Sequence, residues 1–275
     1  MIANIKSRVE QASKTMQLQR RECKYIVPES VIPALREFIE PFVLPDPNGV
    51  GDIPEYTVGT IQLDSADLSL HYAKAEERIN RFKLRIRTYG TEPKGIPVFL
   101  EIKRKFAHTI VKSRCTIKWE DWSQDLLLGR HFDLDFKNDT EKEAFFEFIR
   151  LTDQIQAVPK VIIRYERESY FGKQEKYARV TIDRRIRYRP CHNFELFPEG
   201  GSWWPIDTHD SLKRSFAGVI LELKTFNEVP TWMVDCVREF SLVQTGFCKY
   251  SSAMDAENLF TGSKSYTDAE GTGWY

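Results

Sequence analysis

The chain has 275 residues, of which 41% are apolar, 13% aromatic and 29% charged. These proportions exclude general disorder, collagen and a membrane bundle, and a chain of this length buries a sizeable core without disulfides or metal. Lys plus Arg and Asp plus Glu both number 40, so the formal net charge is zero, and we expect no nucleic-acid partner although a local basic site is allowed.

The five cysteines are odd in number and show no C-x-x-C spacing, which favours reduced thiols over a disulfide framework or a zinc site. The first twenty residues hold no continuous apolar stretch, and no apolar run approaches the ~18 residues of a membrane helix. We therefore expect a cytoplasmic protein with no integral membrane segment. An association with a membrane or with a partner of phosphate metabolism stays open.

Three regions follow one another along the chain. Residues 1–19 form an N-terminal extension with apolar residues at helical spacing, and residues 262–275, rich in Gly, Ser and Thr, are typical of a flexible tail. No linker divides residues 20–261, so we expect a single domain there.

Helix signals between these ends are few. Ser30 favours a helix to about Ile39, and Asp67 favours another through Lys74. Thr140 with Glu143 forms a capping-box pattern ahead of a third helix, and Pro230 precedes a fourth. Strand-like segments outnumber the helices and are close enough for antiparallel pairing; they cover about 56–65, 81–89, 97–105, 108–118, 158–169, 177–188 and 218–226.

Many of these strands alternate apolar residues with charged ones. Lys83, Arg85 and Arg87 share one face of their strand, opposite Leu84 and Ile86. The same alternation recurs in four further strands, whose charged faces carry Glu101, Lys103 and Lys105; Lys112 and Arg114; Arg179, Thr181, Asp183 and Arg185; and Glu222 and Lys224.

For any single strand, a solvated face is the better interpretation, because charges are usually exposed. Five such strands, together with helices whose apolar sides need a surface to cover, favour a closed barrel with a charged interior. An empty interior of this kind is costly, because like charges repel and their desolvation costs several kcal/mol per ion. A bound phosphate chain would relieve the repulsion, since Arg and Lys both bind phosphate.

Carboxylates among these cations would repel phosphate directly. The acids concerned are Glu22, Glu101 and Glu222. Their presence is understandable if a divalent cation bridges them to phosphate oxygens. The residue pattern therefore indicates a site for a metal ion and a triphosphate.

Eight short motifs in order resemble those of the catalytic domain of the vacuolar transporter chaperone (VTC) polyphosphate polymerases, within the triphosphate tunnel metalloenzymes or CYTH superfamily. Each motif is weak alone, and together they are a strong signal. They are Arg20-Arg21-Glu22-Cys23-Lys24-Tyr25, Ile61-Gln62-Leu63-Asp64-Ser65, Lys83-Leu84-Arg85-Ile86-Arg87-Thr88-Tyr89-Gly90, Leu100-Glu101-Ile102-Lys103, Tyr165-Glu166-Arg167, Arg179-Val180-Thr181-Ile182-Asp183, Leu221-Glu222-Leu223-Lys224 and Cys248-Lys249-Tyr250.

The resemblance implies an α+β fold, an eight-stranded antiparallel β tunnel with helices packed outside. It implies transfer of the terminal phosphoryl group of ATP onto inorganic polyphosphate, with Mn²⁺ or Mg²⁺. Glu222 is implied as the principal metal ligand, assisted by Glu22 and Glu101. The residues implied to contact the triphosphate or the growing chain are Lys24, Arg85, Arg87, Lys103, Arg167, Arg179 and Lys249, joined by Lys83, Lys112, Arg114 and Lys224.

The sequence departs from the wider superfamily in one informative place. Arg20 stands where the superfamily has its first acid, which matches the VTC branch and argues against a thiamine triphosphatase or an adenylate cyclase. Cys248 replaces the usual Ser. No SPX-like regulatory region is visible, so coupling to membrane translocation is not implied. A triphosphatase of the same fold and a polyphosphate-binding module without activity remain as alternatives.

Other chemistry has little support. The sequence contains no G-x-x-x-x-G-K-S/T, no G-x-S-x-G and no H-E-x-x-H, and its five histidines are scattered. The loop 190–217 carries Trp203-Trp204, which could stack an adenine, although packing over the barrel is the preferred interpretation. Arg184, Arg187 and Arg189 differ in phase from Arg179 or lie at a strand end, and we treat them as rim charges at most.

Overall fold

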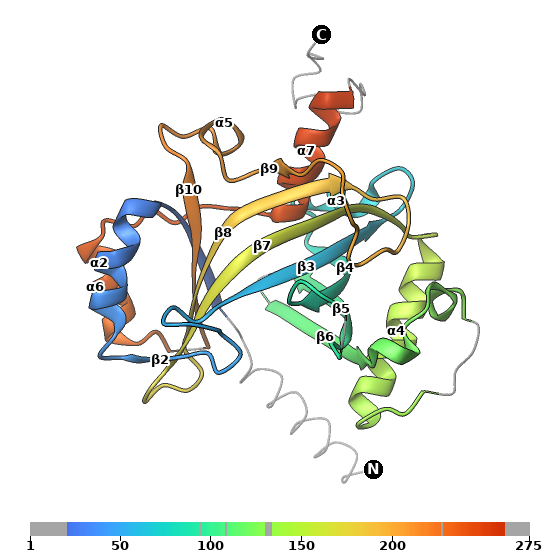
Figure 1. The fold of residues 1–275 in the computed structure, drawn as a ribbon, viewed down its shortest axis with the longest axis horizontal. Helices are drawn as coiled ribbons and strands as arrows, with labels where there is room; N and C mark the ends of the chain where they lie inside the picture. The colour runs from blue at the N-terminus through green and yellow to red at the C-terminus, as the bar shows by residue number, and fades with distance from the viewer. Residues whose placement is uncertain (1–20, 94, 108, 130–133, 227, 262–275) are drawn as a thin grey trace.

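A computed structural model describes residues 21–93, 95–107, 109–129, 134–226 and 228–261. The N-terminal extension and the C-terminal tail therefore lie outside the described residues. Figure 1 shows one strongly curled sheet with helices packed around it.

Seven of the strands agree with the expected segments to within a few residues. The strand bounds are β1 (Arg21–Pro28), β2 (Val43–Pro45), β3 (Glu55–Asp64), β4 (Asn80–Tyr89), β5 (Val98–Phe106), β6 (Thr109–Ile117), β7 (Val158–Gly172), β8 (Arg179–Pro190), β9 (Trp204–Pro205) and β10 (Gly218–Thr225). Of these, β1 was expected only from the family motif, and β2 and β9 were not expected. The helices are α2 (Ile32–Ile39), α3 (Ser69–Ala75), α4 (Asp139–Gln154), α5 (His209–Leu212), α6 (Thr231–Glu239) and α7 (Lys249–Thr261). Short 3₁₀ turns cover Glu29–Val31, Trp119–Asp121 and Gln124–Leu128.

Eight of the strands follow one another in the hydrogen-bonded order β1-β10-β8-β7-β3-β4-β5-β6, all antiparallel. The sheet bends into a half-barrel (Figure 1). The predicted α+β architecture, with an eight-stranded antiparallel sheet and external helices, is confirmed. Among the described strands no pairing joins β1 to β6, so the sheet differs from a fully closed barrel. An ion pair of 3.2 Å between Lys103 on β5 and Glu22 on β1 links the two ends.

Large parts of the convex face of the sheet are apolar, and helices cover it in two places. Leu84, Ile86 and Ile102 pack with Phe145 and Phe148 of α4 in one core cluster. A second cluster joins β1, β8 and β10 to α2 and α6, with all of the following buried: Val180, Ile182, Leu221, Leu223, Leu35 and Met233. Apolar positions therefore point outward, which leaves the charged positions of the same strands on the concave face.

A third core cluster closes one end of the concave face. Ile163 and Tyr165 of β7 pack there against Tyr250, Ala253 and Met254 of α7. This contact places the first residue of α7, Lys249, at the inner side of the sheet. A helix thus contributes one of the cations that the sequence assigned to the charged interior.

Two helices begin on caps that differ from the expected ones. The cap of α4 is Asn138, whose side chain accepts a hydrogen bond from the Glu141 amide, so the predicted Thr140–Glu143 capping box is wrong by two residues. The first turn of α3 is held by Asp64, which accepts hydrogen bonds from the amides of Leu70 and His71 at 2.8 and 2.9 Å. A carboxylate at the end of β3 therefore fixes where α3 begins.

We predict that Phe148→Ala destabilises the fold by about 3–5 kcal/mol, because the side chain is fully buried and its removal leaves a cavity under the sheet. Phe146 lies two residues away on the same helix and is 46% exposed, so Phe146→Ala is the matched control and should cost much less. Urea denaturation followed by circular dichroism measures both. Equal losses of stability would contradict the assigned core face of α4.

Candidate phosphate-binding cavity

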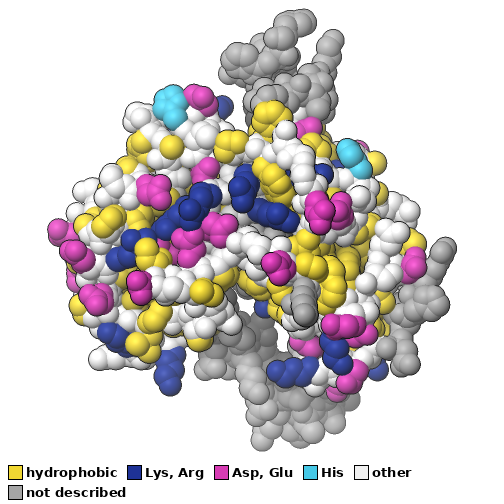
Figure 2. Space-filling view, viewed as in Figure 1, with side chains coloured by type: hydrophobic (Ala, Val, Ile, Leu, Met, Phe, Trp, Pro, Cys, Tyr) yellow, Lys and Arg dark blue, Asp and Glu magenta, His cyan; other side chains and the backbone are white. Residues whose placement is uncertain are grey.

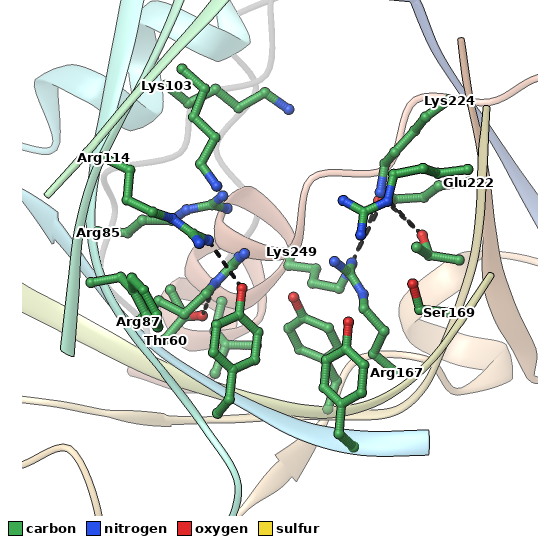
Figure 3. A pocket seen from close by; sticks show the side chains of 18 of the residues that line it. Thr60, Arg85, Arg87, Lys103, Arg114, Arg167, Ser169, Glu222, Lys224 and Lys249 are labelled. Carbon is green, nitrogen blue, oxygen red and sulfur yellow. Dashed lines mark hydrogen bonds and ion pairs between the residues drawn. The ribbon is translucent and has the colours of Figure 1, made fainter. Parts of the chain in front are cut away.

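The concave face of the half-barrel encloses a cavity of about 1210 Å³. Cations from β4, β5 and β6 face cations from β7, β10 and α7 across it (Figure 3). Of the fourteen site residues assigned from sequence, thirteen line the cavity: Glu22, Lys24, Lys83, Arg85, Arg87, Lys103, Lys112, Arg114, Arg167, Arg179, Glu222, Lys224 and Lys249. The exception is Glu101. The alternation of charged and apolar residues on separate strands therefore predicted correctly that these charged side chains line one common cavity.

Glu101 lies behind the cations of the first wall. Its fully buried carboxylate contacts Arg85 and Lys112, each at 2.6 Å, together with Arg114 and, at 3.6 Å, Arg87. Burial alone would raise the pKa of Glu101, but Arg85, Arg87 and Arg114, together with Lys112 when it is protonated, hold it far below its usual value. One ionised acid thus orients four basic side chains, each of which the sequence assigned individually as a contact to the triphosphate.

Glu222 has the corresponding place on the second wall. Its carboxylate lies 2.5 Å from Lys224 and 3.3 Å from Lys24, and more distantly from Lys249 and Arg167 at 3.9 and 3.7 Å. Burial would raise the pKa of Glu222, yet the surrounding cations lower it well below its usual value. Unlike Glu101, this carboxylate borders the cavity.

Glu22 shares a cation with Glu222. The ammonium group of Lys24 lies 3.4 Å from Glu22 and 3.3 Å from Glu222, so both carboxylates converge on one point of the cavity wall. Burial and the nearby Glu222 raise the pKa of Glu22, whereas Lys103, Lys224 and Lys24 lower it, with a net fall to about 2. Both acids are therefore ionised at neutral pH.

Asp183 is a fully buried anchor for which sequence reasoning gave no role. It receives two hydrogen bonds from Arg167, at 2.6 and 2.7 Å, and one from Lys249 at 2.6 Å. The residue stands in the motif Arg179-Val180-Thr181-Ile182-Asp183, so its presence was visible while its partners were not. Its carboxylate fixes two cations that come from different parts of the chain.

Aromatic side chains support the same cations. Tyr165 lies under both Lys249 and Arg167, with the cationic groups 4.6 and 5.2 Å from its ring centre. Tyr89 accepts a hydrogen bond of 3.1 Å from Arg114. Burial raises the pKa of Tyr89, but Arg87 and Arg114 outweigh it and produce a net decrease. Both tyrosines stand in the recognised motifs, whereas Asp46, which lines the cavity 3.6 Å from Arg179, had no signal in the sequence.

Some basic side chains of the cavity titrate far from their ordinary range. Burial lowers the pKa of Lys112 to about 6; Arg85 and Arg114 lower it further while Glu101 opposes them. Burial also lowers the pKa of Lys224 to about 8, assisted by Arg167 and opposed by Glu222. The charge of the cavity therefore depends on pH, and an anion that enters it favours the protonated lysines.

One expectation about the facing of a residue needs correction. Arg185 was expected on the charged face with Arg179 and Asp183, but it is exposed and pairs with Glu55 outside the cavity. The cause is a bulge, since the register between β7 and β8 shifts between Arg164 and Glu166 and Arg185 has a φ of 51°. An extra residue reverses the facing of every residue beyond it.

Glu101 lies on the expected charged face, but it is buried beneath the other site residues. The sequence suggests it as an assisting metal ligand, whereas the structure buries it completely and surrounds it with Arg85, Arg87, Lys112 and Arg114. The alternation of charges along a strand predicts on which face of the sheet a residue lies, but it does not predict how deeply the side chain is buried. The position of Glu101 favours the role of a counter-ion for these cations.

The remaining acids fit a divalent metal only in part. No group of three or more His, Cys, Asp or Glu gathers around one point in the described part of the chain. Glu22 and Glu222 supply hard oxygen donors on one wall, which suits Mg²⁺ or Mn²⁺ held by one or two carboxylates with phosphate oxygens as further ligands. Two protein ligands with the substrate as a third therefore form a compatible donor set.

Comparison with known proteins now identifies the family. A family model for the VTC domain matches residues 19–258. The chain belongs to the VTC domain family. No curated protein sequence matches it, and none of the helices in the described ranges is long and apolar enough to cross a membrane. All five cysteines of this VTC domain protein are free thiols.

Three solved structures are similar to the chain at low identity. The PH1819 protein from Pyrococcus horikoshii has 14% identity and a TM-score of 0.44, with 86% of this chain and 99% of that one covered. A putative adenylyl cyclase from Hippeastrum, described as having a dominant triphosphatase activity, has 15% identity and a TM-score of 0.47 (coverage 86% and 95%). A putative adenylate cyclase from Vibrio parahaemolyticus has 11% identity and a TM-score of 0.43 (86% and 98%). With identities and scores this low, none of the three informs the function.

We predict that Glu101→Gln destabilises the protein by about 3 kcal/mol, because the buried Arg87 and the partly buried Arg85 and Arg114 lose their common counter-ion, as does Lys112 when it is protonated. Added tripolyphosphate should restore part of the loss by neutralising the same cations. Thermal melts with and without tripolyphosphate measure this. Glu147→Gln removes a partly exposed carboxylate of α4 that pairs with Arg150 and with Arg104 of β5; it is the control and is expected to cost about 1 kcal/mol. A variant as stable as the wild type would contradict the anchoring role of Glu101.

We also predict that anion binding near pH 7 takes up a proton at Lys112. The pKa of the free protein is about 6, so the side chain is mostly neutral there; a bound polyanion raises that pKa. Affinity should therefore fall as the pH rises above about 6. Calorimetry with tripolyphosphate in buffers of different ionisation enthalpy measures the uptake. Lys112→Met should abolish it, whereas Lys105→Met, on β5 but outside the cavity lining, should not. Equal uptake in both variants would disprove the assignment.

Proposed function

We propose that this VTC domain protein is a polyphosphate polymerase, which transfers the terminal phosphoryl group of ATP onto a chain of inorganic polyphosphate inside the cavity. The observation that carries the proposal is the convergence of eleven Lys and Arg side chains from separate elements on one hollow of about 1210 Å³. Phosphoryl transfer rests on positioning and on neutralising charge, which is what such a lining supplies.

The two walls have separate tasks in this proposal. The first wall, Arg85, Arg87 and Arg114, has its guanidinium groups oriented by Glu101 and offers bidentate contacts to phosphate. On the second wall, Arg167 and Lys249 are oriented by Asp183. Because their counter-ions are buried beneath them, these cations keep their geometry while the cavity is filled or emptied. The triphosphate of ATP and the end of the acceptor chain bind between the walls.

The phosphoryl transfer requires no general base. A terminal oxygen of the acceptor chain, already anionic, forms a bond to the γ-phosphorus of ATP as the bond to the β-phosphate oxygen breaks. ADP leaves, and the chain is one phosphate longer. The lining cations bind the oxygens whose charge is redistributed in the transition state.

A divalent ion, Mn²⁺ or Mg²⁺, belongs to this proposal. Glu222 is the principal ligand, with Glu22 assisting, because the two carboxylates converge on the same point of the wall. The ion supplies bridging and charge neutralisation at the phosphate oxygens when bound. Lys24 and Lys224 now contact Glu222 and would compete with such an ion, so metal affinity should rise when phosphate draws these lysines away.

The deciding experiment incubates purified protein with ATP and Mn²⁺ and resolves the products by gel electrophoresis. We expect phosphate chains that lengthen with time. Release of free phosphate alone would support the triphosphatase alternative, in which water takes the place of the acceptor chain. Binding of polyphosphate without turnover would support a binding module.

We predict that Glu222→Ala abolishes turnover, with a fall of at least about a hundredfold, because the proposed metal ligand is lost. Thermal melting of this variant in the presence of tripolyphosphate checks that the fold is kept. Glu147→Ala, which removes a carboxylate far from the cavity, is the control and should leave activity unchanged. Normal activity of Glu222→Ala would remove the metal role assigned to this side chain.

A further inference from the structure

A cluster of three arginines lies on the outer face of the sheet, away from the cavity. Arg164 on β7 is paired directly with Arg187 on β8, and Arg189 follows two residues later on the same face. Its neighbours Ile163 and Tyr165 line the cavity, so Arg164 points to the opposite side of the sheet. Lys and Arg side chains gather across the middle of the molecular face on which β7 and β8 lie (Figure 2).

These arginines converge on Trp203. Their guanidinium carbons lie 4.8 Å (Arg164), 5.8 Å (Arg187) and 5.9 Å (Arg189) from the centre of its ring, all within the range of cation–π contacts. Trp203 is held in place because it packs against the core cluster of α4 and because the next residue, Trp204, pairs with Tyr188. The indole is thus a fixed platform for three positive charges.

No ion pair neutralises this cluster within the described part of the chain. Arg189 donates a hydrogen bond to the Gly200 carbonyl, and the nearby Glu166 accepts one from Thr57. Like charges opposite one another on a sheet are destabilising. The mutual repulsion shows in the pKa of Arg164, which burial, Arg187 and Arg189 lower against the opposing effect of Glu166.

A second basic group on β8 provides the contrast. Arg184 pairs with Glu55 and Glu168 at 2.9 and 2.6 Å, and Arg185 also pairs with Glu55. Further along the same strand, Arg187 and Arg189 form no ion pair with a described acid. The difference separates basic residues that stabilise the fold from basic residues whose charge is available to a ligand.

We propose that Arg164, Arg187 and Arg189, arranged around Trp203, form a second phosphate-binding site on the outer face of the sheet, which takes a linear phosphate polyanion. Several negative charges in a short length match three guanidinium groups around one ring, and guanidinium binds phosphate oxygens in pairs. Polypeptide carboxylates match less well, because side chains on one face of an extended peptide are two residues, roughly 7 Å, apart.

The test uses the indole N–H resonances of ¹⁵N-labelled protein during titration with tripolyphosphate and with long-chain polyphosphate. No tryptophan of residues 21–261 that the structure describes lines the cavity, so the resonance assigned to Trp203 by the Trp203→Phe variant reports the outer site. We expect this resonance to shift on titration. Its midpoint should rise about tenfold or more in Arg164→Gln/Arg187→Gln, through loss of charge-assisted contacts.

The matched control is Arg150→Gln/Arg185→Gln, which removes two exposed guanidinium groups that have acidic partners. It should keep the wild-type midpoint. The proposal is overturned if the Trp203 resonance does not move, if both double variants weaken binding equally, or if polyglutamate at the same charge concentration gives the same midpoint as polyphosphate. Because this readout is independent of turnover and of the cavity, an inactive protein that still binds at Trp203 would refute the proposed polymerase without refuting the outer site.

Discussion

The structure depends on the balance between converging cations and the acids buried beneath them. Eleven basic side chains point into one hollow, and their repulsion would open the sheet if nothing opposed it. Glu101 and Asp183 oppose it from full burial, one on each wall, and Glu222 does so at the cavity surface. These acids let the protein keep a concentrated positive field in a pre-formed geometry. The apolar core then needs only to cover the outer side of the strands.

Much of this arrangement could be predicted from sequence, because a strand has a period of two. The alternation of Lys83, Arg85 and Arg87 with buried Leu84 and Ile86 fixes both the strand and the face on which its charges lie. Repeated over five strands, and combined with the order of the motifs, it identified thirteen of the cavity residues. The formal net charge of zero gives no hint of this basic cavity. The alternation of charged and apolar residues along each strand shows it, because that pattern is local.

What could not be predicted depends on geometry that the pattern does not encode. One extra residue at the β7–β8 bulge turns Arg185 outward, and the sequence contains no glycine or turn signal there. The depth of Glu101 and the partners of Asp183 follow from side chains that meet across strands distant in sequence. For the same reason the sequence indicates only rim charges at Arg187 and Arg189, although the β7–β8 and β8–β9 pairings bring them together with Arg164 around Trp203.

The seam between β1 and β6 has a consequence for how a polymer reaches the interior. Elsewhere along the described sheet, neighbouring strands separate only if backbone hydrogen bonds break. No described strand pairing closes the seam, and an ion pair between Lys103 on β5 and Glu22 on β1 spans it, with a strength that declines in salt and in the presence of competing anions. Under the proposed function, a long phosphate chain that exchanges with this pair would enter the groove from the side, with no need for a free end to pass through an opening.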